Sequence, residues 1–272
     1  MISVLNDVSS LVSENALSMT QNNLQNTLTE LSTGLRLNSG SEDPAGISIA
    51  DGLGANIAAL TQSSQNASNG VGLLQTADGA LSQVTTLLNQ AVTIATEAAN
   101  GGLTTDQATA ADTEFQSILA EINQIGTTTN FNGVAVFSAT PQTVFTSDGT
   151  TTGATTTSTT TGALSSTTLG LNADVLTSTA AAGTALTDIT AAIATVAATR
   201  GTIGASVNQL TADSAVENTE VTNLTSAQNN VQNADIGTTV ANMTQYNVLE
   251  QTGMAALSQS NAAQQNVLKL LQ

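Results

Sequence analysis

The chain has 272 residues, and its 3 lysines and arginines against 20 aspartates and glutamates give a formal net charge of -17. Nucleic-acid binding and docking on an anionic membrane both need basic patches, which three cations cannot make. The sequence has 0 His and 0 Cys, which excludes imidazole and thiolate metal sites, Cys nucleophiles and His-based triads. We therefore predict a protein that is not an enzyme, with no catalytic, cofactor or metal site.

The apolar composition indicates what kind of core the chain can build. Hydrophobic residues make up 40% of the chain, but aromatic residues only 2%. A core without large rings is thin, with helix packed on helix through Leu, Ile, Val and Ala. No apolar run approaches the ~18 residues of a membrane-spanning helix. Residues 1–7 have neither the basic start nor the apolar stretch of a cleavable secretory signal, so we expect no such signal.

The first predicted helix has apolar residues three and four positions apart, the spacing of a coiled-coil seam. Its stripe contains Leu24, Leu28, Leu31 and Leu35. Residues 38–40 break the pattern. A second helix is expected to start near residues 41–44, where Ser41 or Asp43 can cap it and a proline fits the first turn. Its seam continues from Leu74 to Ala98, and two glycines end it.

The middle of the chain carries the β-signals. A third helix after Thr105 has the stripe Phe115, Ile118, Ile122 and Ile125. The following Asn132-Gly133, flanked by β-formers, is typical of a hairpin turn. All four phenylalanines lie between residues 115 and 145, where we expect a small conventional core. Between Thr150 and Thr168, eleven of nineteen residues are Thr, which predicts a solvated β-hairpin or loop and not a buried strand.

A helical pattern returns near Ala180. Its stripe contains Ile189, Ile193, Val196, Ile203, Val207 and Leu210. Arg200 stands at a seam position and is expected to bridge to another helix by hydrogen bonds. A last helix after Asp235 carries Val240, Met243, Met254, Leu257, Leu268 and Leu271. Terminal helices this thinly apolar are not stable alone, so their order should depend on self-association.

The pattern as a whole predicts a mainly α fold: an elongated antiparallel helical hairpin or coiled-coil core with a small β-hairpin region in the middle. The chain runs out along helices, turns through the β part and returns along helices, which would place its two ends together.

Segments at both ends of the chain resemble the terminal signatures of bacterial flagellins. The N-terminal matches are residues 31–50, 65–81, 98–101 and 129–134, from LSTGLRLNSG to TNFNGV. The C-terminal matches are residues 223–227, 233–235 and 264–271. The last of these segments reads QQNVLKLL. The resemblance covers roughly residues 1–137 and 185–272, in the order found in the family.

The resemblance implies a structural subunit of the extracellular flagellar filament, which polymerises with itself for motility. It leaves the cell unfolded by type III export, and its terminal helices order on assembly. An export chaperone, the filament cap and the hook–filament junction proteins are the implied partners. Residues 1–40 and 235–272 would form the inner coiled coil. Residues 41–184 and 185–234 would form the outer core, with the β and Thr-rich region in the first of these segments.

We also derive candidate residues from this resemblance. Arg36 would form an ion pair, with Glu42 or Asp43 as partner, and Asp43 would first of all cap a helix. The helix that faces the innate Toll-like flagellin receptor in relatives lacks their Arg and Glu here, so Leu88, Gln90 and Ile94 predict weak binding. The candidate assembly residues are Leu24, Leu28, Leu31, Leu35, Arg36, Asn38, Asp43, Leu257, Asn266, Val267, Leu268 and Leu271.

Three alternatives compete with a filament subunit. A hook–filament junction protein shares the N-terminal pattern more than the C-terminal one. A secreted coiled-coil interaction protein would need neither signature. A filament-displayed zinc protease would need an HExxH motif, which the absence of His excludes.

Overall fold

The structure is a computed structural model that describes residues 8–147 and 156–270, and it is mainly α-helical. The helices are α1 Val8–Thr33, α2 Pro44–Ala99, α3 Thr105–Thr128, α4 Thr179–Gln232 and α5 Ile236–Leu270. Two short antiparallel strand pairs lie between α3 and α4 in the sequence: β1 Asn130–Phe131 with β2 Val134–Ala135, and β3 Gln142–Phe145 with β4 Thr156–Thr159. This confirms the mainly α fold with a small β region.

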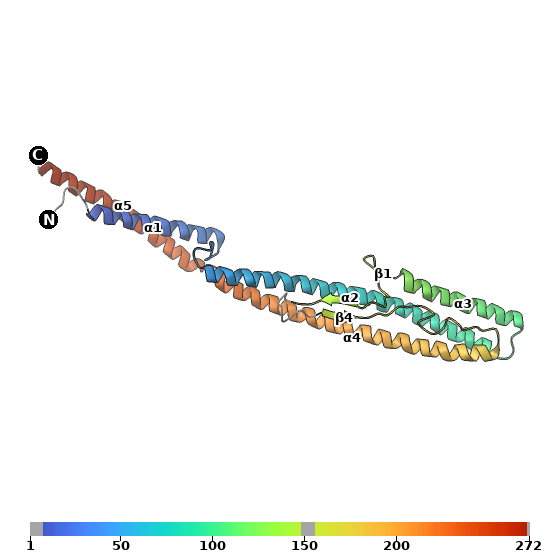
Figure 1. Ribbon diagram of the computed structural model, residues 1–272. Coiled ribbons are helices and arrows are strands. Elements are labelled where there is room, and N and C mark those ends of the chain that lie inside the picture. Colours follow the sequence, from blue (N-terminus) through green and yellow to red (C-terminus); the bar gives the residue numbers. More distant parts are fainter. Residues whose placement is uncertain (1–7, 148–155, 271–272) are drawn as a thin grey trace. The chain divides into compact units, whose positions relative to one another are not determined.

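The chain divides into two compact units. Unit 1 comprises Met1–Ala55 and Leu224–Gln272, and unit 2 comprises Asn56–Asn223. In unit 1, α1 and α5 pack against each other and run antiparallel (Figure 1). In unit 2, α2 and α4 also run antiparallel, because contacts that advance along α2, from Ser63 to Asp78, step back along α4, from Glu217 to Arg200.

The core of unit 2 is built on a heptad seam. Positions three and four apart along α2 are buried without interruption, which is the pattern of a helix that keeps one stripe against its partner. These positions are Leu60, Ser63, Ala67, Gly70, Leu74, Ala77, Leu81, Val84, Leu88, Ala91, Ala95 and Ala98. From α4 the seam receives Ala182, Ala185, Ile189, Ala192, Val196, Ile203 and Leu210. Alanines at many positions allow the close approach that a nearly ring-free core requires.

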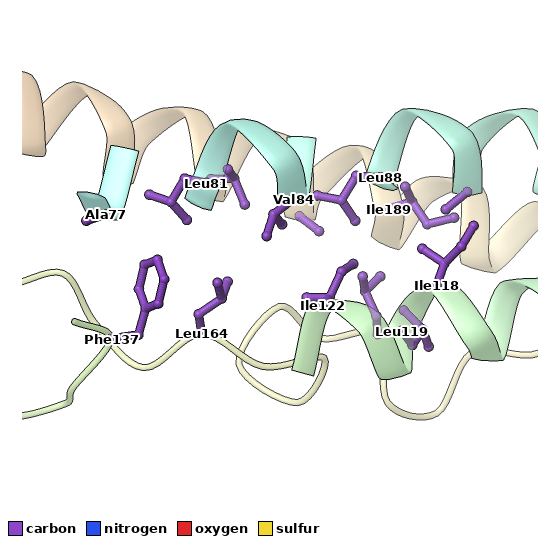
Figure 2. Close-up of a cluster of buried hydrophobic side chains, with 14 of the residues drawn as sticks. Ala77, Leu81, Val84, Leu88, Ile118, Leu119, Ile122, Phe137, Leu164 and Ile189 are labelled. Carbon is purple, nitrogen blue, oxygen red and sulfur yellow. The ribbon is translucent and has the colours of Figure 1, made fainter. Parts of the chain in front are cut away.

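A third layer covers this helix pair. Figure 2 shows Ile118 and Ile122 of α3 facing Leu88 of α2, with Phe137 and Leu164 from the non-helical segments beside them. Phe115, Leu171 and Leu176 are buried in the same cluster. Unit 2 therefore buries its apolar residues among three helices and the irregular segment between β4 and α4, which carries Leu164, Leu171 and Leu176.

The expected phenylalanine core is confirmed in part. Phe115 and Phe137 are buried, whereas Phe131 is half-buried and Phe145 is 44% exposed. The hairpin between β1 and β2 is confirmed. Its two central residues have positive φ, 51° at Asn132 and 81° at Gly133. This is the combination that a two-residue primed turn requires and that Asn-Gly adopts readily.

The expectation of a solvated Thr-rich segment is wrong for part of the segment. Thr157, Thr161 and Ser166 are buried. Thr157 Oγ1 donates to Asp213 at 3.1 Å, and Asn123 donates to Ser166 Oγ at 3.1 Å. Because hydroxyls can be satisfied by such partners, threonine content alone does not place a strand in solvent. Residues 148–155, which belong to the same prediction, lie outside the described residues.

Helix α4 corrects a second expectation. By length and composition it is apolar enough to cross a membrane, although the core helix of a soluble protein meets the same test. Its seam residues Ala185, Ile189, Ala192 and Val196 are buried in the core of unit 2, whereas Ala191, Ala194 and Ala197 are exposed. The seam therefore accounts for part of the apolar composition.

We predict that Gly126→Ala destabilises unit 2, because a Cβ at this buried position in α3 would clash with the Leu164 carbonyl oxygen. Overpacking of this kind costs about 1–3 kcal/mol. Gly79→Ala in α2 is the matched control, since nothing lies within 4 Å of its added Cβ. The control should gain about 0.5–1 kcal/mol from lower chain entropy. Urea denaturation of the monomer measures both, and equal midpoints for the two variants would contradict the packing.

Candidate assembly surface

The pair of α1 and α5 in unit 1 is joined by a seam in which polar and apolar residues alternate. The positions at least half-buried along α1 are Ser10, Ser13, Leu17, Thr20, Leu24, Thr27 and Leu31, with Glu30 half-buried beside the last of them. Along α5 they are Thr239, Met243, Tyr246, Glu250, Gly253, Leu257 and Ser260. Both series follow the 4-3 spacing of a coiled coil. With a hydroxyl, a carboxylate or a glycine at about every second position, this seam buries little apolar surface.

Large apolar side chains lie exposed on the rest of the pair. On α1 they are Val8, Leu11, Val12, Met19 and Leu28. On α5 they are Ile236, Val240, Val248, Leu249 and Met254. Exposed apolar residues this numerous on one small unit are typical of a surface that associates with another protein. We call these two sets the exposed apolar surface of unit 1.

The predicted leucine stripe of the first helix is partly wrong. Leu24 and Leu31 are half-buried in the seam, but Leu28 is 47% exposed and Thr27 is the buried residue in its place. The physical reason is the register: Thr27 lies three residues after Leu24 and four before Leu31, whereas Leu28 points away. In α5, Met243 and Leu257 face α1, while Val240 and Met254 belong to the exposed set.

Leu35 does not continue the first helix. Helix α1 ends at Thr33, and Gly34 takes a positive φ of 73° while its N–H donates to the Glu30 carbonyl at 2.8 Å. This is a left-handed cap, for which glycine is favoured. Leu35 then pairs with Asn233 in an isolated antiparallel bridge. The chain that leaves α1 is thereby fixed to the chain that links α4 and α5.

Arg36 strengthens this junction through backbone carbonyls. Its guanidinium Nη2 donates to the Val231 carbonyl at 2.7 Å, and its own N–H donates to the Gln232 carbonyl at 2.7 Å. Both acceptors belong to the last turn of α4, where carbonyls lack helical partners and a cation is favoured by the helix dipole. The expected ion pair with Glu42 or Asp43 is absent from the described residues.

The residues after Arg36 organise the start of α2. Glu42 accepts the N–H of Asn38 at 2.8 Å, and the Asn38 side chain donates to the Leu35 carbonyl at 2.7 Å. Asp43 Oδ1 accepts the N–H of Gly46 at 3.0 Å, which confirms Asp43 as the helix cap. Asn38 and Asp43 thus shape the loop between α1 and α2.

The remaining candidates are the C-terminal assembly residues and the receptor-facing residues of α2. Asn266 is exposed in α5, whereas the Val267 and Leu268 side chains and the whole of Leu271 lie outside the described residues. Among the receptor candidates, Gln90 is exposed and Ile94 is half-buried. Leu88 is fully buried in the seam of unit 2, so it is removed from any receptor-facing surface.

Arg200 bridges two helices, as predicted. Its Nε lies 2.7 Å from Asp78 Oδ1, and a second bond joins Nη2 to Oδ2 at 3.2 Å. The hydrogen bond from Arg200, with its charge as a smaller cause, holds the pKa of Asp78 below its ordinary value of 3.8. Both side chains are more than a third exposed, so the pair fixes the register of α2 on α4 more than it adds stability.

The leucine spacing alone does not reveal the buried polar residues Thr27, Thr239 and Glu217. The 4-3 register of each helix, continued through polar positions as well as apolar ones, would predict that these three residues are buried. Across residues 8–147 and 156–270, no group of three or more Asp or Glu side chains could hold a metal ion.

Two family models match the chain, and together they span most of it. The model of the bacterial flagellin N-terminal helical region matches residues 4–142, and that of the bacterial flagellin C-terminal helical region matches residues 186–271. A flagellin of Halalkalibacterium halodurans is 31% identical over 250 residues, which cover 91% of this chain and 91% of that protein.

Other flagellins match one part of the chain. Flagellin 1 of Proteus mirabilis is 39% identical over 129 residues, 47% of this chain and 35% of its own length. The flagellin of Serratia marcescens is 40% identical over 130 residues, 48% of this chain and 37% of its own length. The crystal structure of Bacillus cereus flagellin covers 56% of this chain and 87% of its own, with 26% identity and a TM-score of 0.49.

We predict that Arg36→Gln loosens the junction between the end of α4 and the start of α2. The variant loses the charge at the α4 terminus, which is worth about 0.3–1 kcal/mol at an exposed site. Hydrogen exchange should therefore accelerate in residues 229–236 of the monomer and stay unchanged around Ala91 in the seam of unit 2. Arg36→Lys, which keeps the charge, is the control. Equal exchange rates of residues 229–236 in Arg36→Gln and in the wild type would contradict this role.

Proposed function

The chain belongs to the bacterial flagellin family, and we propose that the exposed apolar surface of unit 1 is where its copies associate in the filament. The family consists of structural proteins, and the function is that of a subunit that polymerises into the extracellular flagellar filament. What the family does not specify is which residues of this chain drive the assembly.

The observation that supports the proposal is the contrast between the two units. Unit 2 covers its helix pair with a third layer, whereas the described part of unit 1 leaves large apolar side chains of α1 and α5 exposed. Burial of apolar surface contributes about 25 cal/mol per Å². Ordering the chain opposes it by about 1–2 kcal/mol per residue. With these opposing terms, α1 and α5 gain their order on assembly and the free monomer does not polymerise prematurely.

We propose that residues 1–40 and 235–272 form the inner layer of the filament. Residues 41–184 and 185–234 would then form the surrounding layer. The division is supported by the density of exposed apolar side chains on α1 and α5, since an inner layer is covered by neighbours on all sides.

The remaining partners follow from the family and stay proposals. The chain is exported unfolded by the flagellar type III route, on which an export chaperone, the filament cap and the hook–filament junction proteins meet it. The net charge of -17 and the lack of Cys suit an unfolded chain that must not cross-link or aggregate.

Two alternatives are disfavoured. A junction protein would share the N-terminal pattern more than the C-terminal one, yet a C-terminal flagellin model matches residues 186–271. A coiled-coil interaction protein would have no reason to match both flagellin models.

We predict that Val248→Ser in α5 weakens assembly and leaves the monomer folded. Val248 is 54% exposed, so the substitution removes little from the monomer but loses the burial of a valine on association. That burial is worth about 1.5–3 kcal/mol, or a roughly ten- to hundredfold rise in critical concentration. Val216→Ser in α4 of unit 2, at 57% exposure, is the matched control and should change assembly far less.

Assembly is measured by electron microscopy and sedimentation of heat-dissociated monomers, cooled with ammonium sulfate and short filament seeds. A truncation of residues 264–272 should also abolish tubes and spare the secondary structure of unit 2. The assignment of the surface is refuted if Val248→Ser assembles like the wild type while Val216→Ser does not.

We further propose weak activation of the innate flagellin receptor. The exposed α2 residue Gln90 and its neighbour Thr93 carry no charge where recognised relatives have Arg and Glu. A reporter-cell assay of the monomer should show low potency. Full potency would contradict the proposal, and a gain on Gln90→Arg would support it.

A further inference from the structure

Glu217 is a carboxyl group in a position where a coiled-coil seam normally holds an apolar residue. It lies on α4 in the register of Ile203 and Leu210, and it is only 5% exposed. Its Oε1 accepts the hydroxyl of Ser63 from α2 at 2.6 Å. Its Oε2 is buried and has no hydrogen-bond partner in the described structure. An ionised carboxylate with one unsatisfied buried oxygen is costly.

The hydroxyl that meets Glu217 also holds the end of β3. Ser63 Oγ accepts the N–H of Ser147 at 2.8 Å and lies 3.3 Å from the Phe145 carbonyl oxygen. The hydroxyl has one proton for these two acceptors, and Glu217 Oε1 is the nearer of them. One serine therefore connects three segments of unit 2: α4, α2 and the chain that leaves β3.

The charges around this contact are all negative. On α4 itself, Asp213 and Glu220 lie one turn on either side of Glu217 and raise its pKa through their charge. The facing helix α2 has no charged residue between Asp51 and Asp78, and the strands β3 and β4 have none. Asp148, which follows Ser147, lies outside the described residues. No cation in the described structure contacts Glu217.

We propose that Glu217 is a proton-operated clamp, which fixes the end of β3 to the α2–α4 seam when the carboxyl is protonated and releases it on ionisation. The inference concerns the monomer and does not depend on the assembly surface in unit 1.

The direction of the pH effect follows from burial. Desolvation raises the pKa of Glu217 above its ordinary value of 4.5, the hydrogen bond from Ser63 lowers it, and the charges of Asp213 and Glu220 raise it further. A raised pKa in the folded state means that the stabilisation is complete below pH 4.5 and is lost as pH rises through the folded-state pKa. The clamp is therefore closed below pH 4.5 and opens as pH rises through the raised pKa of Glu217.

The test is hydrogen exchange of the full-length monomer at pH 5 and pH 8, corrected for the intrinsic exchange rate. Peptides covering residues 142–147 and 210–220 should be several-fold more protected at pH 5 in the wild type. Glu217→Gln, which keeps the shape and is never ionised, should show the high protection at both pH values. Glu121→Gln on α3 is the matched control, because it removes one charge from an exposed residue that does not perturb Glu217, and it should behave like the wild type.

Two further variants keep the test decisive. Among the described residues, Asp174 is a second buried carboxyl with an unpaired oxygen, and its pKa is raised first by burial and then by Asp188. Asp174→Asn therefore removes that separate contribution to the global pH dependence. Glu217→Leu restores an apolar seam residue and replaces Glu217→Gln if the latter does not fold.

Carbon-13 NMR of glutamate-labelled monomers gives a direct reading. One carboxyl resonance, absent in Glu217→Gln, should titrate at a higher pH than the resonances of the exposed glutamates. The proposal is overturned if that resonance titrates with the exposed groups. It is equally overturned if Glu217→Gln keeps the wild-type difference in protection between pH 5 and pH 8.

Discussion

Two helices packed against each other can bury only one stripe of each, and this limit governs both units of the chain. In unit 2 the pair of α2 and α4 is covered by α3 and by the irregular segment that carries Leu164 and Leu171. The core is therefore shielded from solvent although it contains few aromatic rings. Over the described part of unit 1 no such layer covers α1 and α5, and their outer apolar side chains stay exposed. A unit that is incomplete as a monomer is suited to completion by other copies.

Periodicity predicts the helices well because a seam repeats its constraint at every turn. The start of α2 at Pro44, its cap at Asp43 and the hairpin at Asn132-Gly133 could be read from the sequence, since each depends on local backbone chemistry. The exposure of Leu28 could not, because it depends on which of two adjacent residues faces α5. The contact of Arg36 with Val231 joins residues far apart in the chain, and spacing within one helix contains no information about it.

Polar residues in the seams have a common physical effect. Thr27 satisfies its hydroxyl on its own helix, by donating to the Asn23 carbonyl at 2.8 Å, so it can be buried without a partner on α5. Such residues keep the 4-3 geometry and lower the apolar area that the pair buries. Helix pairing is thus specified by shape with little apolar burial. This low burial supports the proposed association of α1 and α5 with neighbouring copies and the proposed proton dependence at Glu217.

Tyr246 has a consequence for how the chain can be observed. It is the single tyrosine in a sequence without tryptophan, and it lies half-buried in the seam between α5 and α1. Ultraviolet emission of the native protein therefore comes from one ring in unit 1, with negligible contribution from the four phenylalanines of unit 2. Without any label, the intensity and anisotropy of that emission report changes in the packing of α1 against α5, separately from the melting of the core.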